Sequence, residues 1–356
     1  MSDLDALRTP CPLLDVDVLD ANLRRAADLA ARLGVVLRPH AKTHKCVQVA
    51  RRQLAAGAVG LTVATTAEAE AFAAGGATDL FVAYPLWVDA DRGRRLRALA
   101  ERTALRVGVD SAEGAAALAR HAGGAAEVLV EVDSGHHRTG VRPEEAGAVA
   151  TAAARAGLRV RGVFTFPGHA YGPGLASPVA GQEAAALAAA AAAVRAAGHE
   201  VDVVSGGSTP TLGSTQGGPA TELRPGVYAL NDAQQLELGT CGAGDLALTV
   251  LAMVVSRRPG TVVLDAGSKV LGADRPAWTT GWGRLPAVPG ARVTALSEHH
   301  ATVALPEGAA VPALGARLRV APNHVCTAVN LADELVAVRG DAVVDRWRVD
   351  ARGANT

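Results

Sequence analysis

The sequence predicts an α/β protein in which a (β/α)8 TIM barrel is followed by an antiparallel β domain. From about residue 16 to residue 230, eight short β-branched runs alternate with alanine-rich helical segments. That count favours a closed barrel, although a doubly wound open sheet looks similar in any one stretch. After about residue 245, apolar runs follow one another without a long helix. We therefore expect a barrel over residues 16–240 and a β domain over residues 241–356, with residues 1–15 packing with the β domain.

The elements of the barrel are expected in a regular order. The first helix, Val18–Leu33, precedes the first strand rather than following it. The expected strands are Val35–Leu37, Val59–Ala64, Leu80–Tyr84, Leu105–Asp110, Glu127–Asp133, Val160–Phe166, Val201–Ser205 and Leu223–Leu230. The helices expected between them include Ala67–Ala74, Ser111–His121, Pro143–Ala156 and Gln182–Ala197.

The β domain is expected from a series of closely spaced apolar runs. These runs are Leu246–Val255, Thr261–Leu264, Arg292–Leu296, Ala301–Leu305, Arg317–Val320, Val336–Arg339 and Ala342–Arg348. The last two flank Gly340-Asp341, a pair of residues suited to a two-residue hairpin turn.

Charge and composition exclude several classes of partner. The 35 Lys+Arg balance 35 Asp+Glu over 356 residues, which argues against nucleic acid or an anionic membrane surface. The alanine-rich run Glu183–Arg195 is shorter than a membrane span, and the acidic start Met1–Asp5 lacks an apolar signal core. Four cysteines without a CxxC pair are too few for a disulfide scaffold. We expect a cytoplasmic protein that binds neither nucleic acid nor membrane.

Two segments that follow strands have the chemistry to hold a phosphorylated cofactor. The first is Arg38–Lys45, in which Lys42 lies among histidines and other cations that would lower its pKa and make it a nucleophile. The second is Gly206–Thr211, whose glycines and hydroxyls can cradle a phosphate. A lysine opposite such a cradle is what covalent binding of pyridoxal phosphate requires. In isolation, solvated lysines and a flexible Gly/Ser loop explain the same residues.

His324-Val325-Cys326 offers a possible metal pair. If these residues lie on a strand, residues i and i+2 point to the same face, so the imidazole and the thiolate can share one cation. Nitrogen and sulfur ligands favour zinc, and two protein ligands leave an open, catalytic site. A buried cysteine beside a core histidine is the alternative.

Together these residues resemble the fold-type III pyridoxal phosphate enzymes, the alanine racemase-like superfamily, and within it the metal-dependent D-threonine aldolase and D-serine dehydratase family. The resemblance extends from Thr9–Asp15 to the C-terminal β domain, and its most specific part is Arg38–Lys45. It implies that Lys42 is the catalytic, cofactor-bearing lysine and that Arg138 lies near the pyridine ring. The other cofactor-binding residues that it implies are His169, Tyr171, Gly207, Ser208, Thr209, Gly226 and Tyr228.

The resemblance also bears on the reaction. Aldolases of the family have His-x-Asp at the metal pair, whereas the D-serine dehydratase type has His-x-Cys, as at His324 and Cys326 here. In one departure from the family, Phe164 stands where a tyrosine is expected, seven residues before Tyr171. The resemblance implies a homodimer that uses pyridoxal 5'-phosphate and a divalent metal, zinc or else Mn or Mg, to eliminate water from a D-3-hydroxyamino acid such as D-serine.

Three alternatives remain open at this stage. Retro-aldol cleavage to glycine and an aldehyde would use the same residues. A non-catalytic pyridoxal phosphate carrier would be a single barrel, which the expected β domain argues against. A simple racemase would need no metal.

Overall fold

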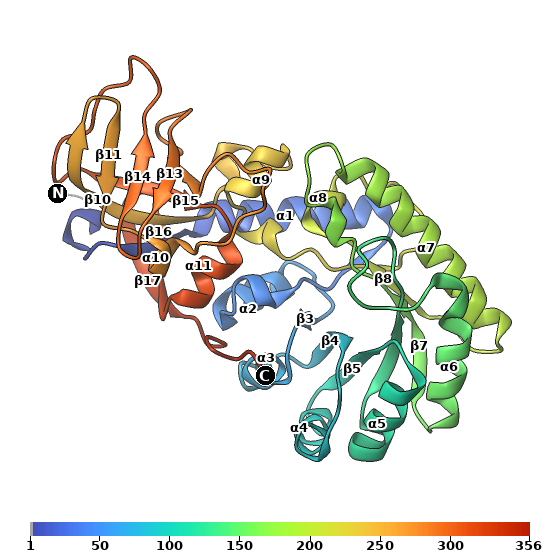
Figure 1. Ribbon diagram of the computed structural model, residues 1–356. Helices are drawn as coiled ribbons and strands as arrows, with labels where there is room; N and C mark the ends of the chain where they lie inside the picture. The colour runs from blue at the N-terminus through green and yellow to red at the C-terminus, as the bar shows by residue number, and fades with distance from the viewer. Residues whose placement is uncertain (1–2) are drawn as a thin grey trace. The chain divides into compact units, whose positions relative to one another are not determined.

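The computed structural model describes residues 3–356, which form two compact units (Figure 1). The β unit contains the chain up to Arg24, Thr43–Gln48 and Val227–Gly353. The barrel unit contains Arg25–Lys42, Val49–Gly226 and Ala354–Thr356. The chain therefore passes between the units several times, once between Lys42 and Thr43.

Eight parallel strands form the barrel unit's sheet, in the order β2-β9-β8-β7-β6-β5-β4-β3. The first and last strands meet at a parallel bridge between His40 and Thr62, where the Thr62 hydroxyl also donates to the Arg38 carbonyl at 2.8 Å. The (β/α)8 barrel predicted from the sequence is confirmed. The strands are β2 (Val36–Leu37), β3 (Leu61–Val63), β4 (Asp79–Pro85), β5 (Ala104–Val109), β6 (Glu127–Glu131), β7 (Arg159–Phe164), β8 (Val203–Gly206) and β9 (Glu222–Leu223).

The helices that alternate with these strands begin at residues whose side chains cap them. Thr65, Asp89 and Ser111 accept the N–H groups of Glu68, Arg92 and Gly114. Such caps satisfy backbone donors that have no partner within the helix. The helices of the barrel unit are α3 (Thr66–Ala74), α4 (Ala90–Ala100), α5 (Ala112–Ala122), α6 (Ala146–Arg155), α7 (Ala176–Ala196) and α8 (Thr209–Leu212). The helices α1 (Val16–Leu33) and α2 (Val47–Ala55) each have residues in both units.

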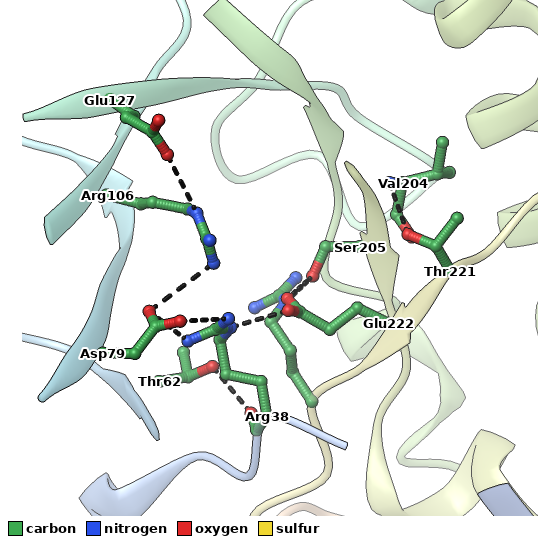
Figure 2. A network of polar contacts seen from close by, with 10 residues as sticks. Arg38, Thr62, Asp79, Arg106, Glu127, Val204, Ser205, Thr221 and Glu222 are labelled. Atoms are coloured by element: carbon green, nitrogen blue, oxygen red, sulfur yellow. Dashed lines mark hydrogen bonds and ion pairs between the residues drawn. The ribbon is translucent and has the colours of Figure 1, made fainter. Parts of the chain in front are cut away.

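The inside of the barrel contains a network of charges (Figure 2). Arg38 is 2% exposed and bonds Asp79 at 2.7 Å and Glu222 at 2.6 Å. The network continues from Asp79 to Arg106, at 3.6 Å, and from Arg106 to Glu127, at 3.4 Å. Side chains fill such barrels in layers, usually apolar ones. Here one part of the filling consists of paired ions.

A sheet of nine strands forms most of the β unit, in the order β11-β14-β13-β12-β15-β10-β1-β16-β17, with β11 also pairing with β10. The strand nearest the N-terminus, β1, runs antiparallel to β10 and parallel to β16. Gly340, with φ of 59°, forms the predicted hairpin turn between β16 and β17. The strands are β1 (Cys11–Asp15), β10 (Leu248–Arg258), β11 (Thr261–Leu264), β12 (Gly283–Arg284), β13 (Arg292–Leu296), β14 (Ala301–Ala304), β15 (Arg317–Pro322), β16 (Glu334–Arg339) and β17 (Ala342–Arg348).

One predicted strand is much shorter than expected. Of Leu223–Leu230, only Leu223 is in a strand, because Pro225 has no N–H to donate to the ladder and Val227–Ala229 forms a 3-10 helix, η6. In the part of the chain that the structure describes, no helix is both long and apolar enough to cross a membrane.

Candidate active site

Lys42 lies just beyond the end of β2, in the short 3-10 helix η2 (Ala41–Thr43). The preceding backbone is fixed by the His40 N–H, which donates to the Pro225 carbonyl at 3.0 Å. The Lys42 Nζ lies 5.2 Å from the centre of the Phe166 ring, which follows β7. Two strand ends of the barrel therefore meet at this lysine, as expected for the catalytic face of such a fold.

Phe166 is the common neighbour of several predicted cofactor contacts. The Arg138 guanidinium lies 5.3 Å from its ring centre, the Tyr171 ring 6.5 Å and the His136 ring 5.7 Å. A ring beside two cations is favourable, because its negative face attracts positive charge. Phe166 was predicted as the last residue of the strand Val160–Phe166 and not as a site residue, although an aromatic residue at a strand end, just before Pro167-Gly168-His169, was a usable signal.

His169 presents an unsatisfied polar atom. Its Nε2 hydrogen-bonds Gln182 at 2.9 Å, and its ring stacks with that of His136 at 6.4 Å. Its Nδ1 is buried without a hydrogen-bond partner among residues 3–356. Burial, together with Arg138 and His169, lowers the pKa of His136. An aromatic wall with one unpaired nitrogen fits a planar heteroaromatic ring such as that of pyridoxal phosphate.

The predicted phosphate cradle is a tight turn after β8. Gly207 has φ of 88°, and a Cβ there would lie 3.1 Å from the Leu223 side chain. Its N–H donates to Glu183 at 2.5 Å, and the Ser208 N–H donates to the Thr211 hydroxyl at 3.0 Å. These two N–H groups thus have protein partners, while the hydroxyls of Ser208 and Thr211 bond each other at 3.1 Å. Binding of phosphate by Gly207, Ser208 and Thr209 stays a prediction.

Three further residues from the sequence prediction lie in different places. Gly226 belongs to the barrel unit, as the last residue of its segment Val49–Gly226. Tyr228 belongs to the β unit, where it is 6% exposed in η6. Phe164 is fully buried and packs edge-on against Phe81 at 5.0 Å. Phe164 is therefore part of the barrel core.

The metal pair does not lie on a strand, and that expectation was wrong. β15 ends at Pro322, and His324 is the N-cap of helix α11 (Val325–Leu331), so that Cys326 lies in the first turn of the helix. The cause is a distant carboxylate: Asp232 Oδ2 accepts the Val325 N–H at 3.0 Å, which satisfies a donor at the start of the helix.

His324 and Cys326 nevertheless contact each other. Burial lowers the pKa of His324, but the charge and hydrogen bond of Cys326 and the hydrogen bond to Asp274 raise it, to about 11. The His324 Nδ1–H donates to Asp274 Oδ2 at 2.5 Å, and the Cys326 Sγ hydrogen-bonds the Thr43 Oγ1 at 3.4 Å. Positive charge is therefore stabilised between an imidazole and a sulfur.

This donor set fits a divalent metal. Asp274 fixes the histidine with its Nδ1 protonated, which leaves Nε2 as a ligand, and nitrogen plus sulfur suits zinc. Within residues 3–356 no group of three or more His, Cys, Asp or Glu side chains forms a complete ligand set. A metal held here would keep positions for water or substrate. Asp274, which lies 50 residues before His324 in the sequence, was missed by the sequence reasoning.

Comparisons with known proteins identify the family of the chain. Residues 14–233 match the alanine racemase N-terminal domain family, and residues 247–338 match the putative serine dehydratase domain. The chain is 36% identical over 369 residues to the D-threo-3-hydroxyaspartate dehydratase of Delftia sp. (strain HT23), covering 96% of this chain and 97% of that protein. It is 36% identical over 366 residues to the D-threonine aldolase of Arthrobacter sp., covering 97% and 93%.

Solved structures of known enzymes are similar to this chain over nearly its whole length. The structure of the Delftia dehydratase is similar with a TM-score of 0.90 at 35% identity, covering 98% of this chain and 99% of that one. One structure of a cysteine-to-alanine variant of that dehydratase is in a metal-free form.

The chain therefore belongs to the fold-type III pyridoxal phosphate enzymes, the alanine racemase-like superfamily. Within that superfamily, the second matched domain and both relatives place it in the branch that includes D-threonine aldolase and the D-threo-3-hydroxyaspartate dehydratase.

Proposed function

We propose that this protein is a pyridoxal phosphate- and metal-dependent lyase that eliminates water from D-3-hydroxyamino acids, giving a 2-keto acid and ammonia. The observation that carries the proposal is the contact of His324 with Cys326 and Asp274. It supplies a cation site of the His-x-Cys type, which the sequence resemblance associates with dehydratases rather than aldolases. The dehydratase from Delftia sp. is similar over nearly the whole chain.

The residues of the chain have separate roles in this proposal. When bound, the cofactor supplies an electron sink and the cation supplies a Lewis acid for a departing hydroxyl group. Lys42 would hold the cofactor covalently, and once the substrate amine has displaced it, the freed Lys42 amine would take the proton from the substrate Cα. Arg138, His169 and Tyr171 would contact the cofactor ring, and the turn Gly207–Thr209 with Gly226 and Tyr228 would hold its phosphate.

Zinc is the cation that we propose for His324 and Cys326. A thiolate ligand disfavours Mg and Mn, which prefer oxygen donors, whereas zinc accepts both nitrogen and sulfur. We also propose that the protein is a homodimer, which sedimentation equilibrium of the purified chain would test.

Retro-aldol cleavage is the second candidate, favoured by the 36% identity to a D-threonine aldolase. It would break the Cα–Cβ bond instead of the Cα–H bond and release glycine and an aldehyde. The residues of the site could serve either reaction, so only the reaction products distinguish elimination from retro-aldol cleavage.

The deciding experiment incubates the holoprotein with D-serine, D-threonine and D-threo-3-hydroxyaspartate and identifies the products. We expect a keto acid and ammonia, whereas glycine and an aldehyde would establish the aldolase reaction instead. A chelator should abolish turnover, and full activity in its presence would remove the metal from the mechanism. Lys42→Ala should lose both turnover and the visible absorbance of the bound cofactor. The matched control is Lys45→Ala, since Lys45 bonds Asn330 at 2.8 Å and should leave that absorbance intact.

A further inference from the structure

Glu131 is a buried carboxyl group to which none of the roles above is assigned. It is the last residue of β6 and is 2% exposed. Its Oε2 is buried without a well-oriented hydrogen-bond partner among residues 3–356, and so is the hydroxyl of Thr139, although the two side chains lie close enough to interact. Unpaired buried oxygens are costly, because each has lost its hydrogen bonds to water. Two such atoms in one place need an explanation.

The two residues line the same small cavity. Its volume is about 10 Å³, and the residues around it include Glu131, Asp133, His136, Arg138, Thr139 and Phe166. A polar cavity of this size holds about one water molecule, provided that two to four polar groups face it. Glu131, Thr139 and Arg138 meet that condition.

Arg138 is the third polar group at the cavity, and it lacks a strong partner of its own. It forms no ion pair with any described residue, and its guanidinium lies over the Phe166 ring at 5.3 Å. Exposed arginines are mobile unless a carboxylate holds them, because ordering the long side chain costs conformational entropy. A hydrogen-bonding partner is therefore needed to order the Arg138 guanidinium beside a cofactor ring.

The charges around Glu131 agree with a link to Arg138. Burial raises the pKa of Glu131 to about 7, while Thr139, Arg138 and Arg224 favour the charged form and Asp110 opposes it. Of the other cavity groups, Asp133 bonds His137 at 2.6 Å, and the pKa of His136 is lowered. Arg224 is held elsewhere, by the Ser205 hydroxyl at 2.8 Å, which leaves Arg138 as the cation at the cavity.

We propose that Glu131 is a positioning residue for Arg138, and that its carboxylate holds the guanidinium through one buried water molecule that Thr139 also binds. The consequence for the cofactor rests on the proposed function, since it requires Arg138 to lie beside the ring of pyridoxal phosphate. The coupling between Glu131 and Arg138 does not depend on the cofactor, so the two can be tested separately.

The first test is a double-mutant cycle on the apoprotein, followed by guanidinium unfolding at pH 8.5. We expect the shift of the unfolding midpoint in the double variant Glu131→Gln/Arg138→Gln to differ from the sum of the shifts in the two single variants. Side chains that are joined by one water molecule are not independent. Additive shifts would overturn the proposal. The control cycle pairs Glu131→Gln with Arg142→Gln, an arginine that bonds Glu145 at 2.6 Å, and should be additive.

The second test measures the dissociation constant of pyridoxal phosphate by absorbance. Glu131→Ala should raise it about tenfold, and Glu131→Ala in an Arg138→Gln background should raise it no further. Glu131→Gln, which keeps an oxygen but not the charge, should raise it by less than Glu131→Ala and should remove the part of its pH dependence between 6 and 8 that Glu131 contributes. An unchanged constant in Glu131→Ala, or additive effects with Arg138→Gln, would overturn the proposal. If the wild-type protein bound no cofactor, the proposed function would be wrong. The double-mutant cycle on the apoprotein would still show whether Glu131 and Arg138 are coupled.

Discussion

At the scale of single residues, the candidate metal pair depends on a carboxylate that is not itself one of the two proposed ligands. Asp274 bonds the Nδ1 of His324 at 2.5 Å, and both side chains are part-exposed. This bond orients the ring and selects the tautomer that has Nε2 available. Outer carboxylates of this kind are a recurrent feature of histidine–metal sites.

We therefore expect Asp274→Asn to weaken metal binding by roughly 10- to 100-fold while both proposed ligands remain. Competition with a chromophoric chelator measures the affinity of the reconstituted apoprotein. The control is Asp341→Asn, because Asp341 is an exposed carboxylate that pairs with Arg319 on the same unit. If Asp274→Asn bound zinc as tightly as the control does, Asp274 would have no part in the site.

Arg38 has a different, structural importance. It is buried between Asp79 and Glu222 (Figure 2), and Glu222 also accepts the Ser205 hydroxyl at 2.7 Å. Arg38→Met would remove this cation from both carboxylates, and Asp79 would keep only its longer pair with Arg106 at 3.6 Å. Breaking a buried pair typically costs about 3–5 kcal/mol. Urea unfolding at pH 7 measures this loss in the free energy of unfolding. Arg94→Met is the control, since Arg94 pairs with Asp91 on the surface. A loss for Arg38→Met no larger than the control's would contradict this account.

The sequence predicts site residues that lie in distinctive local motifs, and it does not point to residues that are defined by distant contacts. Lys42 stands in a recognisable segment, and His324 and Cys326 stand two residues apart. Asp274 carries no local signal and Phe166 only a weak one, since each is recognised mainly by what it touches. Their roles depend on which side chains the fold brings together, and periodicity does not encode that information.

At the scale of elements, two helices of the barrel unit each contain a glycine, but only one of these glycines has room for a Cβ atom. In α4, a Cβ on Gly93 would lie 2.4 Å from the carbonyl oxygen of His121. In α7, a Cβ on Gly181 would meet nothing within 4 Å. The same substitution should therefore change stability in opposite directions.

Gly181→Ala should stabilise the protein by roughly 0.5–1 kcal/mol, because alanine loses less conformational entropy than glycine inside a helix. Gly93→Ala should destabilise it by about 1–3 kcal/mol, because a backbone carbonyl has to move. Thermal unfolding of the two variants makes the comparison, and each is the other's control. Stabilisation of both variants would show that helix propensity outweighs packing at Gly93, and destabilisation of both would contradict the gain expected at Gly181.

Element types were predictable where periodicity is strong and were mispredicted at the site. The strand Thr261–Leu264 is observed as predicted, and β13 and β17 likewise keep their predicted bounds. By contrast, the residues around His324 form a helix start instead of a strand, because Asp232 from another segment accepts the Val325 N–H. The local sequence His324-Val325-Cys326 gives no indication that this carboxylate binds there.

At the scale of the whole molecule, the two units are interleaved along the chain. Cys11 pairs in register with Leu251 and Leu13 with Val336, so the β unit combines both ends of the sequence. Thr43–Gln48 also belongs to the β unit, although Lys42 belongs to the barrel unit. The lysine and the metal pair therefore belong to different units, and Lys42 is joined directly in sequence to Thr43, which bonds Cys326.

A carboxyl group buried in the barrel unit should contribute to the pH dependence of folding. Glu183 is 5% exposed, and burial raises its pKa from 4.5 to about 7, although the Gly207 N–H and Arg224 favour its charged form. Because the folded state binds the proton more tightly, the stability that Glu183 contributes is fully present below about pH 4.5. It is lost as the pH rises through about 7, and the difference in pKa corresponds to about 3 kcal/mol.

Glu183→Gln removes this titration while keeping an oxygen that can accept the Gly207 N–H. We expect the variant to gain stability relative to wild type as the pH rises from 4 to 8, by up to about 3 kcal/mol, with no gain below pH 4.5. Urea unfolding of the apoprotein at several pH values measures the difference. Glu144→Gln provides the comparison, because Glu144 is 66% exposed and should show no such trend. A constant offset between Glu183→Gln and wild type across the pH range would mean that Glu183 titrates alike in the folded and unfolded chain.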